Sequence, residues 1–199
     1  MPSLSVCIIT MNEKDVISAM LESIKSIGDE IVAVDENSTD GTREMLTSAG
    51  ARIIDGRLNG NYSALRNLAI SNCMKDWIFF IDSDETLEPG LINALRSRSL
   101  LVFCEHNRYD AVALKRKNFI DGIRYDNIIV PEAANIQVYP DWQFRLFKNN
   151  GKIRYNLPIH ESLTGYQNGY FSQEDYHILH NKTNARQQMQ NAKYAALRK

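Results

Sequence analysis

Short apolar runs alternate with amphipathic segments along the first 82 residues. The apolar runs predict strands at 4–10, 31–34, 51–54 and 77–81, and the segments between them carry apolar residues at helical spacing. Strands separated by single helices and short connections require right-handed crossovers and a parallel sheet. The pattern therefore predicts an α/β fold with a Rossmann-like, doubly wound and mostly parallel sheet.

The last of these runs, residues 77–81, ends in the sequence Asp82-Ser83-Asp84-Glu85. Carboxylates this close repel one another and lose hydration when they are buried, so a positive charge has to compensate them. A divalent cation, Mg²⁺ or Mn²⁺, would do so through hard oxygen ligands. The alternative is an acidic turn that caps a helix beginning near Pro89.

Polar side chains also end the earlier strands. Thr10 and Asn12 follow the first strand, and Asp35 follows the second. Because the carboxyl ends of parallel strands meet at one edge of a sheet, we expect one crevice built from successive strands. Asn12 is also expected to cap the helix that follows it.

The second half of the chain is less regular, and it predicts a smaller, mixed portion beside the crevice. We expect a single domain over residues 1–199, with a first half (1–100), a second half (101–182) and a C-terminal helix (183–199). The elements expected there are a helix from Pro89 to about Ser99, a strand at 109–119, an irregular excursion at 120–135, a hairpin of 142–148 with 152–155 through an Asn-Gly turn, a strand at 176–180 and a helix at 183–198.

Composition excludes several classes of protein. Lys and Arg number 23 against 24 Asp and Glu, a net charge of -1, which argues against a nucleic-acid surface. The three cysteines, Cys7, Cys73 and Cys104, have no zinc-site spacing and suggest a reducing compartment. With no signal peptide and no apolar run of transmembrane length, we expect a cytoplasmic protein that reaches any membrane-borne substrate peripherally or through a partner.

Two common nucleotide-binding motifs are absent. No Gly-x-Gly-x-x-Gly follows the first strand, and no Gly-Lys-Ser/Thr phosphate loop is present. Nucleotide recognition would therefore use carboxylates and backbone groups at strand ends.

Four segments, in order, resemble the family 2 glycosyltransferases of the GT-A fold. They are residues 5–13, residues 35–42, Arg66-Asn67 and residues 82–85, the last of which contains an Asp-x-Asp motif. Further along, Arg145-Leu146-Phe147 and Pro158-Ile159-His160-Glu161 resemble the branch that contains lipopolysaccharide-core glucosyltransferases and peptide glycosyltransferases. That branch implies a role in cell-envelope polysaccharide synthesis.

The resemblance implies inverting transfer of a sugar from a nucleotide-sugar donor, most often a UDP-sugar, with a divalent cation. It makes residues 1–100 the nucleotide-binding half and the smaller, mixed portion at 101–182 the acceptor-side half. A metal that bridges the diphosphate oxygens would offset the charge that develops on the leaving group. On this sequence, the resemblance implies a nucleotide-binding loop made of Thr10, Asn12 and Glu13, with Asp35 bound to the nucleobase. It implies that Arg66 lies at the nucleotide end of the site and that Asp82 and Ser83 contact the donor or its metal. The implied metal ligands are Asp84 and His180.

Transfer also needs a base that deprotonates the acceptor hydroxyl or thiol. Glu161 is the first choice and Asp141 the second, although Glu161 could also be an ordinary surface carboxylate. Arg145 could contact phosphate or form a structural ion pair, and Trp142 could stack on a sugar or pack in the core. The acceptor, whether glycan, lipid-linked or peptide, is not readable from the sequence.

Two other functions fit parts of the pattern. A nucleotidyltransferase shares the sheet plan and the metal carboxylates, but it would normally show a glycine-rich loop in place of Met11-Asn12-Glu13-Lys14. A non-catalytic domain that binds nucleotide-sugars would not need Asp82, Asp84 and Glu161 together.

Overall fold

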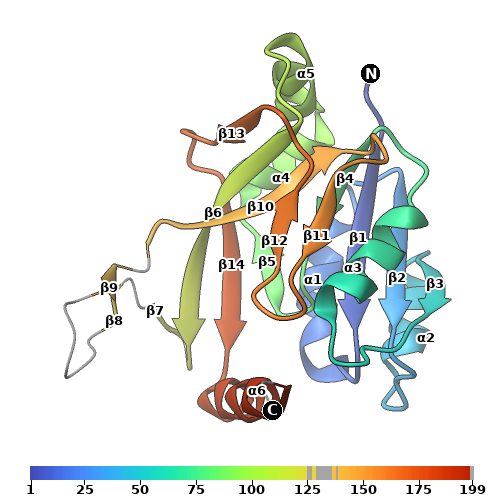
Figure 1. Cartoon of the computed structure of the whole chain (residues 1–199), viewed down its shortest axis with the longest axis vertical. Helices are drawn as coiled ribbons and strands as arrows, with labels where there is room; N and C mark the ends of the chain where they lie inside the picture. The colour runs from blue at the N-terminus through green and yellow to red at the C-terminus, as the bar shows by residue number, and fades with distance from the viewer. Residues whose placement is uncertain (125–126, 129–135, 138, 198–199) are drawn as a thin grey trace.

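The computed structural model describes residues 1–124, 127–128, 136–137 and 139–197. Its main sheet has the strand order β3-β2-β1-β4-β10-β6-β14-β5 (Figure 1). The strands are β1 (Leu4–Thr10), β2 (Glu30–Asp35), β3 (Arg52–Asp55), β4 (Trp77–Phe80), β5 (Glu85–Leu87), β6 (Ala111–Ile120), β7 (Ile123–Arg124), β8 (Asn127–Ile128), β9 (Ile136–Gln137), β10 (Asp141–Lys148), β11 (Arg154–Asn156), β12 (Ser162–Thr164), β13 (Gly169–Phe171) and β14 (His177–Lys182). The helices are α1 (Lys14–Ile24), α2 (Thr42–Ser48), α3 (Tyr62–Ser71), α4 (Pro89–Arg96), α5 (Ser99–His106) and α6 (Asn184–Leu197).

Strands β3, β2, β1 and β4 are parallel and have apolar side chains on both faces. On β4, Trp77 and Phe79 point into one core with α1 and α4, whereas Ile78 and Phe80 point into a second core with α3. Alternate residues of a strand face opposite sides of the sheet, so a continuous apolar run is buried only where helices cover both faces. The predicted α/β fold with a doubly wound, mostly parallel sheet is confirmed.

The later strands extend the same sheet with mixed directions. Strand β10 pairs antiparallel with β4 on one side and with β6 on the other. Strand β14 runs parallel to β6, and β5 lies antiparallel to β14 at the sheet edge. Strand β10 thus joins strands of both halves in one sheet. The single domain over residues 1–199 and its division at residues 100 and 182 stay predictions.

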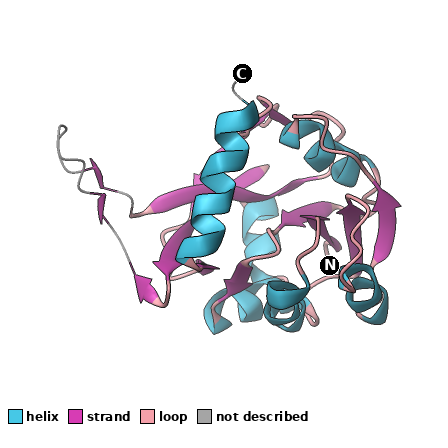
Figure 2. Ribbon diagram, turned by 90° about the horizontal axis from the view of Figure 1, so that it is seen from below, coloured by secondary structure: helices cyan, strands magenta, loops and turns pink. Residues whose placement is uncertain are grey.

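Helix α6 lies across the carboxyl ends of β6 and β14 (Figures 1 and 2). It follows β14 directly, and Arg186 of α6 forms an ion pair with Glu13 in the loop after β1. The first turn of α6 therefore contacts the loop after β1.

The predicted hairpin of 142–148 with 152–155 is wrong. Both strands form, and Gly151 makes a turn with φ +75°, but β11 pairs with β12 in a separate two-stranded sheet. Both edges of β10 are already hydrogen-bonded to β4 and β6, so β11 has no edge of β10 to join. Local turn chemistry indicated the turn correctly but not the partner of the strand.

The helix predicted from Pro89 to about Ser99 forms as α4, but it ends earlier, at Arg96, and a second helix that was not predicted, α5, begins at Ser99. Arg98 separates them with φ +63°, and its guanidinium donates to Ile27 O and to Asp29. These contacts to a distant loop hold a backbone conformation that is unfavourable for arginine. Of the predicted excursion at 120–135, residues 125–126 and 129–135 lie outside the described residues.

The three cysteines are free and buried. Cys7 and Cys73 pack in the same core with their sulfur atoms 3.0 Å apart, as expected for residues that fill the core. Within the part of the chain that the structure describes, no helix has both the length and the apolar character to cross a bilayer.

Gly56 tests the close packing of α3 on the sheet. A Cβ at this position would lie 2.3 Å from Cγ1 of Val34 and 2.9 Å from Cδ2 of Leu65. We expect Gly56→Ala to lower the free energy of unfolding by about 1–3 kcal/mol, because the core cannot absorb another methyl group there. Urea denaturation measures the change.

Gly90 in α4 is the matched control, since its added Cβ would be 3.7 Å from the nearest atom. Gly90→Ala should leave the stability unchanged or raise it by up to about 1 kcal/mol. Equal effects of the two substitutions would contradict the packing described here.

Candidate active site

A cavity of about 1170 Å³ opens at the carboxyl ends of β1 and β4. Its lining includes side chains from both halves of the chain, which are far apart in the sequence. The predicted residues that line it are Thr10, Asn12, Glu13, Arg66, Asp82, Ser83, Asp84, Asp141, Glu161 and His180.

Asp82 lies between two arginines. Its Oδ2 accepts a hydrogen bond from Arg145 Nη2 at 2.6 Å, and its Oδ1 lies 2.9 Å from Arg66 Nη1. Burial by itself would raise the pKa of Asp82, but Arg145 and Arg66 outweigh it and hold that pKa well below its ordinary value. Asp82 is therefore ionised and fixed in place.

Glu85 is fully buried and serves as an anchor for the turn. Its side chain accepts hydrogen bonds from Asp82 N, Arg116 Nη1 and Arg145 Nη2, at 3.0, 3.1 and 2.9 Å. Arginines thus compensate the negative charges of Asp82 and Glu85, a role for which the sequence predicted a metal ion. Arg145, left open between phosphate contact and a structural ion pair, forms structural ion pairs.

Asp84 has a looser set of partners. Its Oδ2 lies 3.4 Å from His180 Nε2 and 3.9 Å from Lys182 Nζ. Burial acts to raise the pKa of Asp84, but His180 and Lys182 together lower it. Asn118 Oδ1, 2.8 Å from His180 Nδ1, orients the imidazole so that Nε2 faces Asp84.

The two candidate bases have different surroundings. Glu161 Oε1 accepts a hydrogen bond from Arg66 Nε at 3.0 Å. Asp141 accepts from Arg116 and Asn118 on Oδ2 and from Gln143 on Oδ1. Burial favours a higher pKa for Asp141, but Arg116 and the two amides lower it. Both carboxylates line the cavity, and Asp141 has more of its lone pairs occupied.

The loop before Glu161 has an unusual backbone. Leu157 and His160 both have positive φ, +72° and +57°. Such conformations are costly for residues with a Cβ and persist where the surrounding structure holds them, as the hydrogen bond from Ser63 Oγ to Leu157 O does here. The strained loop thereby carries Glu161 to Arg66.

The loops after β1 and β2 are hydrogen-bonded to each other. Asn12 N donates to Ser38 Oγ, Asn12 Oδ1 accepts from Thr39 N, and Glu13 N donates to Thr42 Oγ1. The expected N-cap role of Asn12 is wrong: the cap of α1 is Glu13, without a side-chain cap bond, and Asn12 adopts φ +53°. The amide of Asn12 joins the second loop instead of its own helix.

Thr10 is the last residue of β1, and Ser83 follows the neighbouring strand β4. Ser83 Oγ donates to Ile9 O at 3.3 Å. Thr10 Oγ1 is buried and has no hydrogen-bond partner among the described residues. Because a buried hydroxyl without a partner is costly, Thr10 marks a position where a ligand group would be favourable.

Asp35 lies beneath the loops and does not line the cavity. Its side chain has 0% exposure and accepts hydrogen bonds from Ser38 and from Arg43 Nη1. The next residue, Glu36, does line the cavity, and its Oε2 accepts from Leu58 N. Asp35 holds the shape of the loop here rather than presenting its carboxylate.

Sequence reasoning missed several basic and polar residues of the cavity. Lys182 and Arg186 come from the end of β14 and from α6, and Arg116 and Asn118 come from β6. The strand at 109–119 was expected, and alternation along it places Arg116 and Asn118 on one face. No local signal showed that this face meets the carboxylates, because the pairing of β10 with β4 and β6 decides it.

The chain is similar to known proteins both in sequence and in fold. Residues 5–156 match the sequence pattern of Glycosyl transferase family 2. An uncharacterized glycosyltransferase of Rickettsia typhi (strain ATCC VR-144 / Wilmington) is 32% identical over 82% of this chain and 53% of its own length. Glycosyltransferase SunS of Bacillus phage SPbeta is 25% identical over 83% of this chain and 36% of its own length. The chain spans about half the length of the Rickettsia typhi relative.

A solved structure shows the same fold. Residues 1–349 of S. aureus TarS superpose with a TM-score of 0.63 at 18% identity, covering 90% of this chain and 60% of that one. The strand and helix plan is therefore shared well beyond the level of sequence identity. Since the family match covers most of the chain and includes the carboxylate cluster after β4, the protein belongs to glycosyl transferase family 2.

Proposed function

We propose that this chain carries out inverting transfer of a sugar from a UDP-sugar to an acceptor hydroxyl or thiol, with a divalent cation. The observation that carries the proposal is the meeting of Asp84, His180 and Glu161 in one cavity with the loops after β1 and β2. The donor class is supported by S. aureus TarS, whose structure was solved with UDP and with UDP-GlcNAc.

The donor nucleotide is proposed to lie against the loops after β1 and β2. Thr10 Oγ1 would gain its missing hydrogen bond there, and Ser83 and Glu36 line the same part of the cavity. Asp35 is proposed to help recognise the nucleobase indirectly, by fixing the shape of the loop through its hydrogen bond with Ser38. Glu13 and Arg66 contribute charge to the walls while they keep their ion pairs.

The residues present fit a divalent cation. Asp84 and His180 offer a carboxylate oxygen and an imidazole nitrogen 3.4 Å apart, a donor set that suits Mn²⁺. No cluster of three or more His, Cys, Asp or Glu side chains suited to a metal occurs in the described part of the chain, so substrate phosphate and water would complete the shell. When bound, the cation would offset the charge that develops on the departing diphosphate.

Glu161 is the better candidate for the base. Asp141 has hydrogen bonds on both oxygens and a lowered pKa, so it accepts a proton less readily. Arg66 orients Glu161 through Oε1. In the proposed step the acceptor oxygen or sulfur bonds to the anomeric carbon, its proton passes to Glu161, and the bond to UDP breaks on the opposite face.

The cytoplasm is the proposed compartment. Free, buried cysteines fit a reducing environment. Peripheral contact with a membrane would follow if the acceptor is lipid-linked.

Donor binding is tested by the melting temperature with UDP and Mn²⁺. At a UDP concentration of about 100 times Kd, native-state binding adds about 2.7 kcal/mol and should raise Tm by roughly 5–10 °C in a protein of this size. We expect EDTA to remove most of the shift, and Asp84→Asn to remove the part that depends on Mn²⁺.

Asp175→Asn is the control, because the Asp175 side chain is 94% exposed and lies outside the cavity lining. It should keep the full shift. A shift that is equal with Mn²⁺ and with EDTA would reject the metal site while leaving nucleotide binding intact.

The base is tested by Glu161→Gln, which retains an oxygen that Arg66 Nε can contact. We expect release of UDP from the donor in the presence of acceptor to slow by about 10²-fold or more, with the UDP shift in Tm unchanged. The exposed Glu44 gives the control, Glu44→Gln. Normal turnover in Glu161→Gln would contradict this assignment and favour Asp141 as the catalytic base. Binding of UDP without turnover in the wild type would favour a non-catalytic domain that binds nucleotide-sugars.

A further inference from the structure

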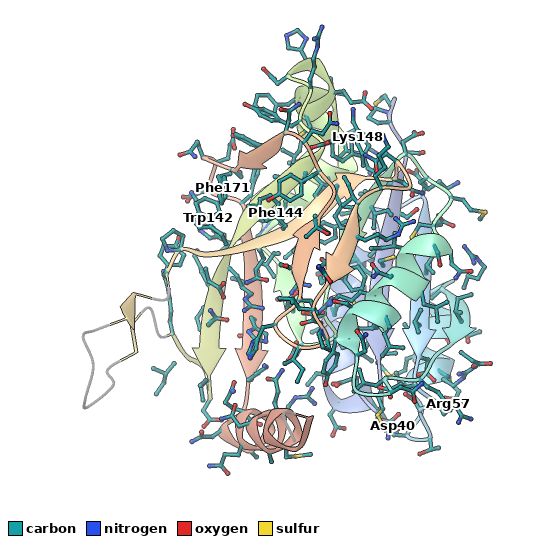
Figure 3. The ribbon with its side chains drawn as sticks, viewed as in Figure 1. Asp40, Arg57, Trp142, Phe144, Lys148 and Phe171 are labelled. Carbon is teal, nitrogen blue, oxygen red and sulfur yellow. The ribbon has the colours of Figure 1, made fainter. Side chains whose placement is uncertain are left out.

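One wall of the cavity is aromatic and has no role in the donor chemistry. Trp142, Phe144 and Tyr166 line this wall, and Phe171 packs behind two of them. Figure 3 shows the labelled rings of Trp142, Phe144 and Phe171 gathered beside β10. We propose that this aromatic wall is the acceptor subsite and that it binds the apolar face of a pyranose ring in a glycan acceptor, which rests on the proposed function.

Strand geometry separates the aromatic wall from the charged centre. Trp142 and Phe144 are two residues apart on β10 and both contact Phe171, with ring centroids 5.2 and 5.4 Å away. Asp141 and Gln143 lie on the other face and bond to each other. Alternation along β10 therefore puts the stacking surfaces and the hydrogen-bonding groups on opposite faces of the strand, although all four side chains line the cavity.

The rings are held rigidly. Phe144 stacks on Tyr166 at 4.9 Å with an interplanar angle of 27°, and its carbonyl accepts a hydrogen bond from Tyr155 Oη at 3.2 Å. Trp142 meets Phe171 edge to face at 88°. A preformed, rigid surface loses little conformational entropy when a ligand binds.

The aromatic wall and the proposed base line the same cavity, and Tyr166 of the wall is close to Glu161 in the sequence. Tyr166 follows Glu161 by way of β12, and Phe144 immediately precedes Arg145, which holds Asp82. A ring stacked here would share the cavity with Glu161 and the donor side chains. The cavity of about 1170 Å³ exceeds the roughly 300–1,000 Å³ typical of a single small ligand, so two substrates have room.

The chemistry of this surface favours a sugar over an acyl chain. A pyranose presents polarised C–H groups on one face and hydroxyls around its edge. The negative face of an aromatic ring attracts the C–H groups, and Ser162, which also lines the cavity, offers a polar partner to the hydroxyls. An acyl chain would gain nothing from that polar group.

The test is binding of the whole chain to an array of neutral oligosaccharides, with UDP and Mn²⁺ present. We expect the wild type to bind at least one glycan, and Trp142→Leu to weaken that binding about tenfold or more, because leucine retains apolar volume but not the aromatic face. Trp142→Phe should restore most of it. Phe103→Leu is the control, since Phe103 belongs to a separate ring cluster with Tyr109 and Tyr170.

Three outcomes would overturn the proposal. They are the absence of binding to any glycan on the array, glycan binding that Trp142→Leu leaves unchanged, and loss with Phe103→Leu equal to that with Trp142→Leu. The UDP shift in Tm is recorded for every variant and shows that each one folds. If glycans bind through Trp142 while UDP gives no shift, the donor assignment fails and the acceptor subsite stands.

Discussion

The ion pairs of Asp82 with Arg66 and Arg145 hold the candidate site together. They join the end of β4 to α3, the preceding element of the chain, and to β10, from which Arg145 reaches Asp82 across 63 residues of sequence. A buried carboxylate is stable only with such partners, and removal of one partner from a buried pair typically costs about 3–5 kcal/mol. Strand pairing with β4 and β6 positions β10, and the Arg145–Asp82 ion pair ties β10 to the turn after β4.

The charged groups of the cavity fall into tight and loose sets. Asp82, Glu85 and Asp141 are held by arginines within 3.1 Å, whereas the side chains of His180 and Lys182 lie 3.4 and 3.9 Å from Asp84. The tight set builds the walls, and the loose one can exchange its partners for a ligand at lower cost. This difference is the physical reason for assigning the metal to Asp84 rather than to the whole acidic cluster.

Glu161 stands where the two proposed substrates would meet. Arg66 links it to the carboxylates of the donor side, and β12 leads from it to Tyr166 of the aromatic wall. A base at this boundary can take a proton from an acceptor while the leaving group departs on the other side. The strained backbone at Leu157 and His160 precedes it, as is common near functional residues.

The sequence by itself determined the parallel half of the fold and its cluster of carboxylates, because buried strands and helices leave a local pattern of apolar residues. It indicated Asp84, Glu161 and His180 as neighbours only through family resemblance. Tertiary structure decided that arginines compensate the charges of Asp82 and Glu85 and that Asp35 lies beneath its loop. It also decided that β11 pairs with β12 rather than with β10. Those outcomes depend on strand pairing between distant segments, which competes with local preferences and leaves no trace in the spacing of residues.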